Sequence, residues 1–148
     1  EFRRVLFRSY ADAMRAHGLP IRDPVNLPSH TASNAPQIQA LMARPDAPTA
    51  FFCTNDLLAI GVISDLKRLG LRVPRDVSVL GYDGIALGAL VEPPLATVVQ
   101  PNADIGTHAI NQLLHRLDVG SAGADGNATL LPHALRIEGT VSAPAVPA

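Results

Sequence analysis

The chain has a single cysteine among its 148 residues, which excludes an internal disulfide and a metal site made of cysteine alone. It also has no excess of basic residues: 12 lysines and arginines stand against 13 aspartates and glutamates, for a formal net charge of -1. We therefore expect no nucleic-acid-binding surface on this chain. No apolar run approaches the length that spans a membrane, so we expect no membrane partner.

Signatures of catalysis and of metal or cofactor binding are also missing from the sequence. No G-x-S-x-G nucleophile motif and no glycine pattern suited to phosphates occurs. Cys53 falls inside an expected buried strand, where it serves as an inert small hydrophobic residue. The histidines are scattered without metal-ligand spacing and are expected to be solvated: His17, His30, His108, His115 and His133. We expect a protein that is not an enzyme and that needs no cofactor.

The sequence does have enough apolar residues for one domain of ordinary size. Hydrophobic residues make up 47% of the chain and charged residues 17%, so a core can form and wholesale disorder is not expected. Residues 1–9, EFRRVLFRS, are basic and apolar without a clear period. Two interpretations stay open for this segment: a cloning or assembly junction that is not native, or a real basic strand or helix.

Hydrophobic periodicity divides the rest of the chain into alternating helices and strands. The expected helices span Tyr10–His17, Ala35–Arg44, Asp56–Leu69 and Ala103–Leu117, with a short one within Ile85–Pro94. The expected strands span Thr49–Thr54, Val77–Tyr82, Leu95–Val99 and a final one within Leu130–Val141. This order predicts an α/β fold with a largely parallel sheet and flanking helices.

The run at Thr49–Thr54 has no polar alternation, which predicts a strand covered on both faces. With the helix at Asp56–Leu69 and the strand at Val77–Tyr82 it forms a βαβ unit, so the two strands are expected to be parallel neighbours joined by a right-handed crossover. Two segments are expected to lie outside helices and strands: the extended, loop-like Ile21–Ala35 and the Gly- and Ala-rich 120–127.

Small polar residues stand where the first two strands end. Asn55 and Asp56 follow the first strand, and Asp83 follows the second, directly before Gly84. Ligands of open parallel sheets bind outside the carboxyl ends of the strands. An amide beside a carboxylate can hydrogen-bond vicinal hydroxyls or a similar polar ligand. A structural interpretation is also open, because Asn and Asp cap helices and an Asp-Gly pair forms turns.

Three motifs taken in order give the chain a family resemblance. TNDLLAIG is followed by GLRVPRDVSVLGYDG and then by PPLATVVQP. Most of the chain from Tyr10 to Thr140 resembles the effector-binding core of LacI/GalR-family (lactose-repressor-like) transcriptional regulators. The resemblance implies a periplasmic-binding-protein-like (type I) fold whose cleft holds a sugar, nucleobase or similar small effector. It further implies a cytoplasmic homodimer in which effector binding alters the affinity for operator DNA.

The same resemblance assigns roles to individual residues. Asn55 and Asp83 fall on positions that the family commonly uses to hydrogen-bond the effector, and Gln100 falls on a hinge-side position, where it is a weaker candidate. The helix Asp56–Leu69 and the segment after Asp83 fall where the family forms its dimer interface. The chain departs from the family pattern at Leu6 in place of an effector-binding Arg, Ala96 in place of Thr and Glu138 in place of Arg.

The resemblance also divides the chain into parts. They are an effector-binding and dimerisation subdomain at 10–101, a helix returning to an amino-terminal subdomain at 102–118, a flexible loop at 119–129, a final strand at 130–141 and a tail at 142–148. The family's helix-turn-helix has no counterpart here, so we expect a fragment that reaches operator DNA only through a missing domain. The apolar stripe of Ala103–Leu117 is then expected to dock loosely, project or self-associate.

Two other classes of function stay open at this point. A periplasmic sugar-binding protein of an ABC transporter shares the architecture and has similar Asn-Asp and Gly-aromatic-Asp-Gly motifs. A catalytically inert interaction domain is the other alternative. The RVPRDVSV turn and the PPLATVVQP motif favour the regulator.

Overall fold

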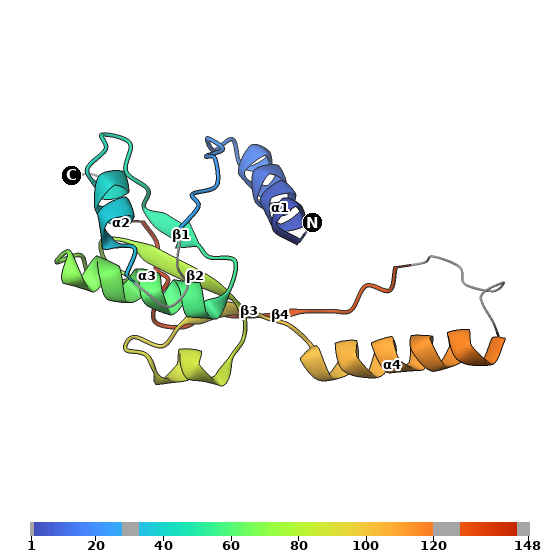
Figure 1. Cartoon of the computed structure of the whole chain (residues 1–148). Helices are drawn as coiled ribbons and strands as arrows, with labels where there is room; N and C mark the ends of the chain where they lie inside the picture. Colours follow the sequence, from blue (N-terminus) through green and yellow to red (C-terminus); the bar gives the residue numbers. More distant parts are fainter. Residues whose placement is uncertain (1, 28–32, 120–127, 145–148) are drawn as a thin grey trace.

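The computed structural model describes residues 2–27, 33–119 and 128–144 (Figure 1). These residues form a sheet with the strand order β1-β2-β3-β4. The strands are β1 (Ala50–Phe52), β2 (Ser78–Asp83), β3 (Ala96–Val99) and β4 (Ala134–Arg136). Strands β1, β2 and β3 are parallel, and β4 pairs with β3 in the antiparallel direction. The predicted α/β fold with a largely parallel sheet, and the parallel pairing of its first two strands, are confirmed.

The expected helices are all present, with shifted ends. They are α1 (Phe2–Ala16), α2 (Ala35–Met42), α3 (Asp56–Arg68), the 3-10 helix η1 (Ala86–Leu90) and α4 (Asn102–Val119). The first helix was expected to begin at Tyr10 but continues upstream through most of the basic first segment. Helix α3 ends just before Gly70, whose φ of +79° suits a residue without a Cβ atom at a helix end. Residues 28–32 and 120–127, part of the two segments expected to lie outside helices and strands, are outside the described residues, as is His30.

The hydrophobic core lies between the sheet and helices α2 and α3, which lie side by side over β1 and β2 (Figure 1). Its fully buried side chains come from both helices and from the strands or the turns that lead into them: Ile38, Val62, Leu66, Val77, Val79 and Leu95. Helix α3 supplies two of them, Val62 and Leu66, because residues four apart share one face of a helix. The core therefore fixes α3, and with it the β1–α3 junction, against the sheet.

The prediction that the first strand is covered on both faces is wrong. Ala50 is exposed and Phe52 is 42% exposed. Residues two apart in a strand share one face of the sheet, and the described residues cover that face of β1, the edge strand, only in part. The upstream segment, with Ile21 42% and Val25 50% exposed, passes nearby without joining the sheet. Only Cys53, which follows β1, is buried as expected.

The final strand is shorter than the expected 130–141, but the chain beyond it stays attached to the sheet. Thr140 is fully buried, and its hydroxyl accepts from Ala96 N at 2.8 Å and donates to Val79 O at 2.7 Å. Its own carbonyl accepts from Val79 N at 2.8 Å. Thr140 thus joins β2 to β3 near the amino ends of both strands.

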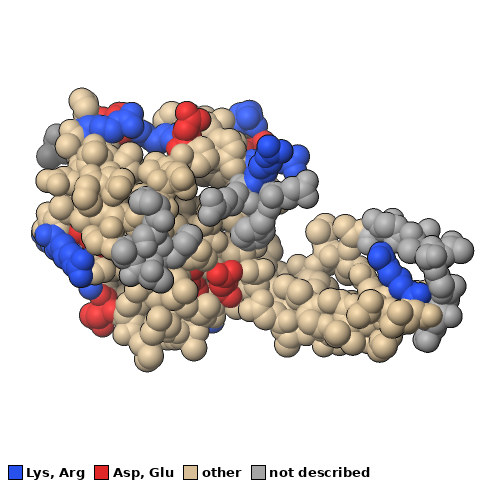
Figure 2. Space-filling model, in the orientation of Figure 1, with Lys and Arg blue, Asp and Glu red and all other residues tan. Residues whose placement is uncertain are grey.

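Helix α4 projects from the body of the molecule, which confirms one of the three behaviours expected for it (Figure 1). Every residue from Asn102 to Leu117 is exposed. We call this projecting helix the arm. Its surface is largely uncharged in the space-filling view, whereas most of the charged side chains in view lie on the body (Figure 2). None of the described helices is both long enough and apolar enough to cross a membrane.

Candidate functional site at the carboxyl edge of the parallel strands

The three residues expected to bind a ligand lie at the same edge of the sheet. Phe52, the last residue of β1, pairs with Leu80, and the chain reaches Asn55 at the start of α3 three residues later, beyond the same end of the strand at which Asp83 ends β2. Asp83 in turn pairs with Val99, the residue before Gln100. Because neighbouring strands are about 4.8 Å apart, the parallel pairing delivers two amides and a carboxylate to one polar rim.

Asn55 is the N-cap of α3. Its Oδ1 atom accepts a hydrogen bond of 2.7 Å from Leu58 N, and its backbone is extended, as is usual for a cap. The structural interpretation of this residue is therefore confirmed. Its side chain is only half-buried, so capping and contact with a ligand at the rim are compatible.

Asp83 ends β2 in an uncommon backbone conformation. Its φ is +119°, a region that residues with a side chain rarely adopt, and Gly84 follows with a φ of +76°. A Cβ atom on Gly84 would lie 2.8 Å from Val99 Cγ1, so the turn packs tightly on β3. Asp83 Oδ1 accepts a hydrogen bond of 2.6 Å from Gln100 Nε2. The half-buried carboxylate is held in place by β3.

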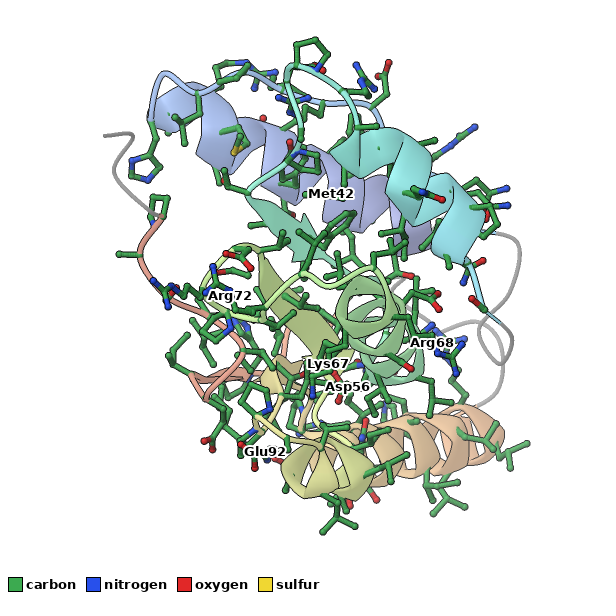
Figure 3. All side chains as sticks on the ribbon, turned by 90° about the vertical axis from the view of Figure 1, so that its left-hand side faces the viewer. Met42, Asp56, Lys67, Arg68, Arg72 and Glu92 are labelled. Atoms are coloured by element: carbon green, nitrogen blue, oxygen red, sulfur yellow. The ribbon has the colours of Figure 1, made fainter. Side chains whose placement is uncertain are left out.

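Asp56 was grouped with Asn55 at the polar rim, but it lies in the interior (Figure 3). It is 0% exposed. Its Oδ1 accepts from the Thr97 hydroxyl at 2.6 Å and its Oδ2 accepts from Ile85 N at 2.8 Å. The spacing of polar residues in the sequence could not show which of two adjacent residues at a helix start is buried. The residue that indicates burial of Asp56 is Gly81, on which a Cβ atom would lie 2.2 Å from Asp56 Oδ1.

A cavity of about 370 Å³ lies beside this edge, where the arm leaves the body. Tyr82 and Gln100 line it from the sheet, His108 and Gln112 line it from α4, and His133 lines it from the segment before β4. Of the three predicted site residues, Gln100 is the one that reaches this cavity. Its lining mixes aromatic, amide and imidazole side chains, which suits a polar ligand of modest size.

The expectation that Cys53 is chemically inert is confirmed. Burial, aided by the negative charge of Asp56, raises the pKa of the Cys53 thiol to about 12. The reactive thiolate is therefore not populated near neutral pH. Among the residues that the structure describes, no three His, Cys, Asp or Glu side chains are grouped so that they could hold a metal ion.

Comparison with known proteins relates this chain to periplasmic binding protein-like domains. Residues 1–141 match the family of periplasmic binding protein-like domains. The HTH-type transcriptional repressor CytR of Escherichia coli (strain K12) is 35% identical over 120 residues, which cover 79% of this chain and 35% of the repressor. The first curated relatives are matched over 22% to 35% of their own length, so the chain spans only part of them.

Solved structures agree with this comparison. A LacI family transcriptional regulator from Arthrobacter sp. FB24, in complex with lactose, superposes with a TM-score of 0.74 at 28% identity, covering 91% of this chain and 50% of the regulator. A LacI family regulator from Enterococcus faecium with bound ribose gives a TM-score of 0.74 at 26% identity, covering 93% of this chain and 50% of the regulator.

Proposed function

The chain belongs to the family of periplasmic-binding-protein-like domains, and we propose that it is the effector-sensing part of a transcriptional repressor. Its relatives include an HTH-type repressor and LacI-family regulators. The observation that supports this most directly is the meeting of Asn55, Asp83 and Gln100 at the carboxyl edge of β1, β2 and β3. The relatives are named as repressors, and they offer no support for a transporter-associated binding protein or for an enzyme.

The proposed effector is a sugar or a similarly polar metabolite. A carboxylate such as Asp83 accepts hydrogen bonds from two neighbouring hydroxyls, while the amides of Asn55 and Gln100 both donate and accept. Two LacI-family regulators of similar structure carry lactose and ribose. The side chains at this edge suit binding without chemistry, so no cofactor is proposed.

The arm formed by α4 is proposed to pack on a further subdomain that supplies the second wall of the cleft. Its exposed apolar side chains are Ile105, Ile110, Leu113, Leu114 and Leu117. Each square ångström of apolar surface that a partner covers contributes about 25 cal/mol.

By the same reasoning the family homodimer would form around exposed leucines of α3 and η1, where Leu57 is 49% and Leu90 is 81% exposed. Operator binding, in the cytoplasm, would belong to a domain outside this sequence.

The proposal is tested on the full-length protein by titrating operator-bound repressor with D-ribose and with lactose. Release or tightening of the operator by either sugar, matched by calorimetric binding to the free protein, is the expected result. If the protein does not bind operator DNA at all, the repressor assignment fails. If it binds operator but responds to neither sugar, the proposed class of effector is wrong.

A further inference from the structure

We propose that Asp56 is the positioning residue of the effector site: its buried carboxyl group sets the relative placement of the three strand ends that carry Asn55, Asp83 and Gln100. This inference rests on the proposed function, because it concerns the site described there. Asp56 itself is 0% exposed and touches no ligand space. It would act only through the residues that it holds.

The hydrogen bonds of Asp56 reach the turn after β2 and the second residue of β3. Oδ2 accepts from the backbone N–H of Ile85, which is in the turn after β2, and Oδ1 accepts from the hydroxyl of Thr97 on β3. Asp56 is the first residue of α3, four residues after the end of β1, and the helix dipole favours a negative charge there. One side chain therefore connects the start of α3, the turn after β2 and the interior of β3.

The sheet is shaped to admit this carboxyl group. Gly81, on the central strand, leaves the space: an added Cβ atom would lie 2.2 Å from Asp56 Oδ1 and 3.1 Å from Leu95 Cδ2. Thr97 is 1% exposed and pairs with Gly81 across the two strands. A buried polar group of this kind is stable only when its hydrogen bonds are made, and both oxygens have donors here.

Each of these connections lies within three residues of a proposed effector contact. Asn55 precedes Asp56 in the chain, Ile85 comes two residues after Asp83, and Thr97 comes three before Gln100. The turn from Asp83 to Ile85 carries two successive positive φ angles, so the surrounding structure must hold it in place. The bond from Asp56 to Ile85 N is such a restraint, and it keeps the Asp83 carboxylate at the rim.

A matched control is available near the amino ends of β2 and β3, away from Asn55, Asp83 and Gln100. Thr140 is also 0% exposed, and its hydroxyl also joins β2 to β3, through Val79 O and Ala96 N. Loss of the Asp56 carboxylate or of the Thr140 hydroxyl removes buried hydrogen bonds and should lower the melting temperature. Only the loss at the carboxyl edge should disturb the proposed site.

The experiment compares the full-length wild type with Asp56→Asn, Thr97→Val and Thr140→Val. Melting temperature, hydrogen exchange of peptides covering residues 83–88, and calorimetric affinity for D-ribose and lactose are measured for each protein. We expect Asp56→Asn and Thr97→Val to speed exchange at the turn and to weaken sugar binding by about tenfold. Thr140→Val should lower the melting temperature comparably while leaving sugar affinity and turn exchange within about twofold of wild type.

The positioning inference is overturned if Asp56→Asn loses melting temperature but keeps wild-type exchange at the turn, or if Thr140→Val weakens sugar binding as much at equal loss of stability. Asp83→Ala, measured in the same experiment, distinguishes a failure of the proposed effector site from a failure of the positioning role of Asp56. If Asp83→Ala binds sugar normally, the proposed site is wrong whatever Asp56 does. If neither sugar binds the wild type, the sugar proposal fails, and turn exchange alone decides for or against the role of Asp56.

Discussion

The side-chain amide of Gln100 donates a hydrogen bond of 2.6 Å to the carboxylate of Asp83. This bond joins the last residue of β2 to the first residue after β3, where the chain leaves the body to form the arm. A ligand that bonds to Asp83 Oδ1 would share this oxygen with Gln100. Gln100 is therefore placed to connect occupancy of the site with the position of α4, which begins two residues later.

A charged substitution of Gln100 can test whether its side chain contacts Asp83 in solution. Gln100→Glu places a second carboxylate against Asp83, and the two negative charges repel each other in the folded state. Uptake of a proton at low pH relieves this repulsion, so stability is lost as pH rises and recovers as pH falls. Urea unfolding at pH 7 and at pH 5 should show this recovery for Gln100→Glu.

Gln100→Ala is the control for that measurement, since it removes the hydrogen bond without adding a charge. We expect its loss of stability, about 2 kcal/mol for a neutral side chain bonded to a charged partner, to be the same at both pH values. Equal pH dependence of the two variants would mean that the side chains do not meet in solution.

The two roles of Asn55 can be separated by substitution. Asp caps helices as well as Asn does, so Asn55→Asp should keep the bond to Leu58 N and the melting temperature. It replaces an amide donor with a carboxylate and should abolish the effector response of the full-length repressor while leaving operator binding intact. Asn55→Ala should lose the same response and, in addition, about 1 kcal/mol of stability through the lost cap. A normal effector response in Asn55→Asp would remove this residue from the site.

An exposed ion pair makes a specific contribution to acid stability. Arg72 donates to Asp76 from its backbone N–H and from its guanidinium, and these bonds lower the pKa of Asp76 to about 2. Because the folded pKa is depressed, the stabilisation is present above the ordinary carboxyl pKa and is lost as pH falls towards 2. Asp76→Asn should remove this part of the pH dependence between pH 5 and pH 2.5, as followed by urea unfolding; an unchanged pH profile would contradict the pairing.

Much of the fold could be predicted because local signals and tertiary packing agree. The helix from Asn102 begins and ends within two residues of its expected bounds, and the Asn55 cap locates the start of α3. The exposure of Phe52 could not be predicted, because burial of a strand side chain depends on which distant segments pack on that face of the sheet. The burial of Asp56 depends on Gly81, a residue of another strand, and no local pattern carries that information.

The apolar stripe of the arm leads to a test on the 148-residue chain itself. With Leu113 53% and Leu117 71% exposed, two copies can lower their free energy by packing these faces together. We expect concentration-dependent self-association in sedimentation velocity, and we expect Leu113→Lys combined with Leu117→Lys to abolish it. His115→Lys, which lies on the other side of the same exposed helix, should leave it unchanged. Strong hydrogen-exchange protection of α4 in a monomeric sample would instead show that the helix docks on its own body, and it would remove the reason to expect a partner subdomain there.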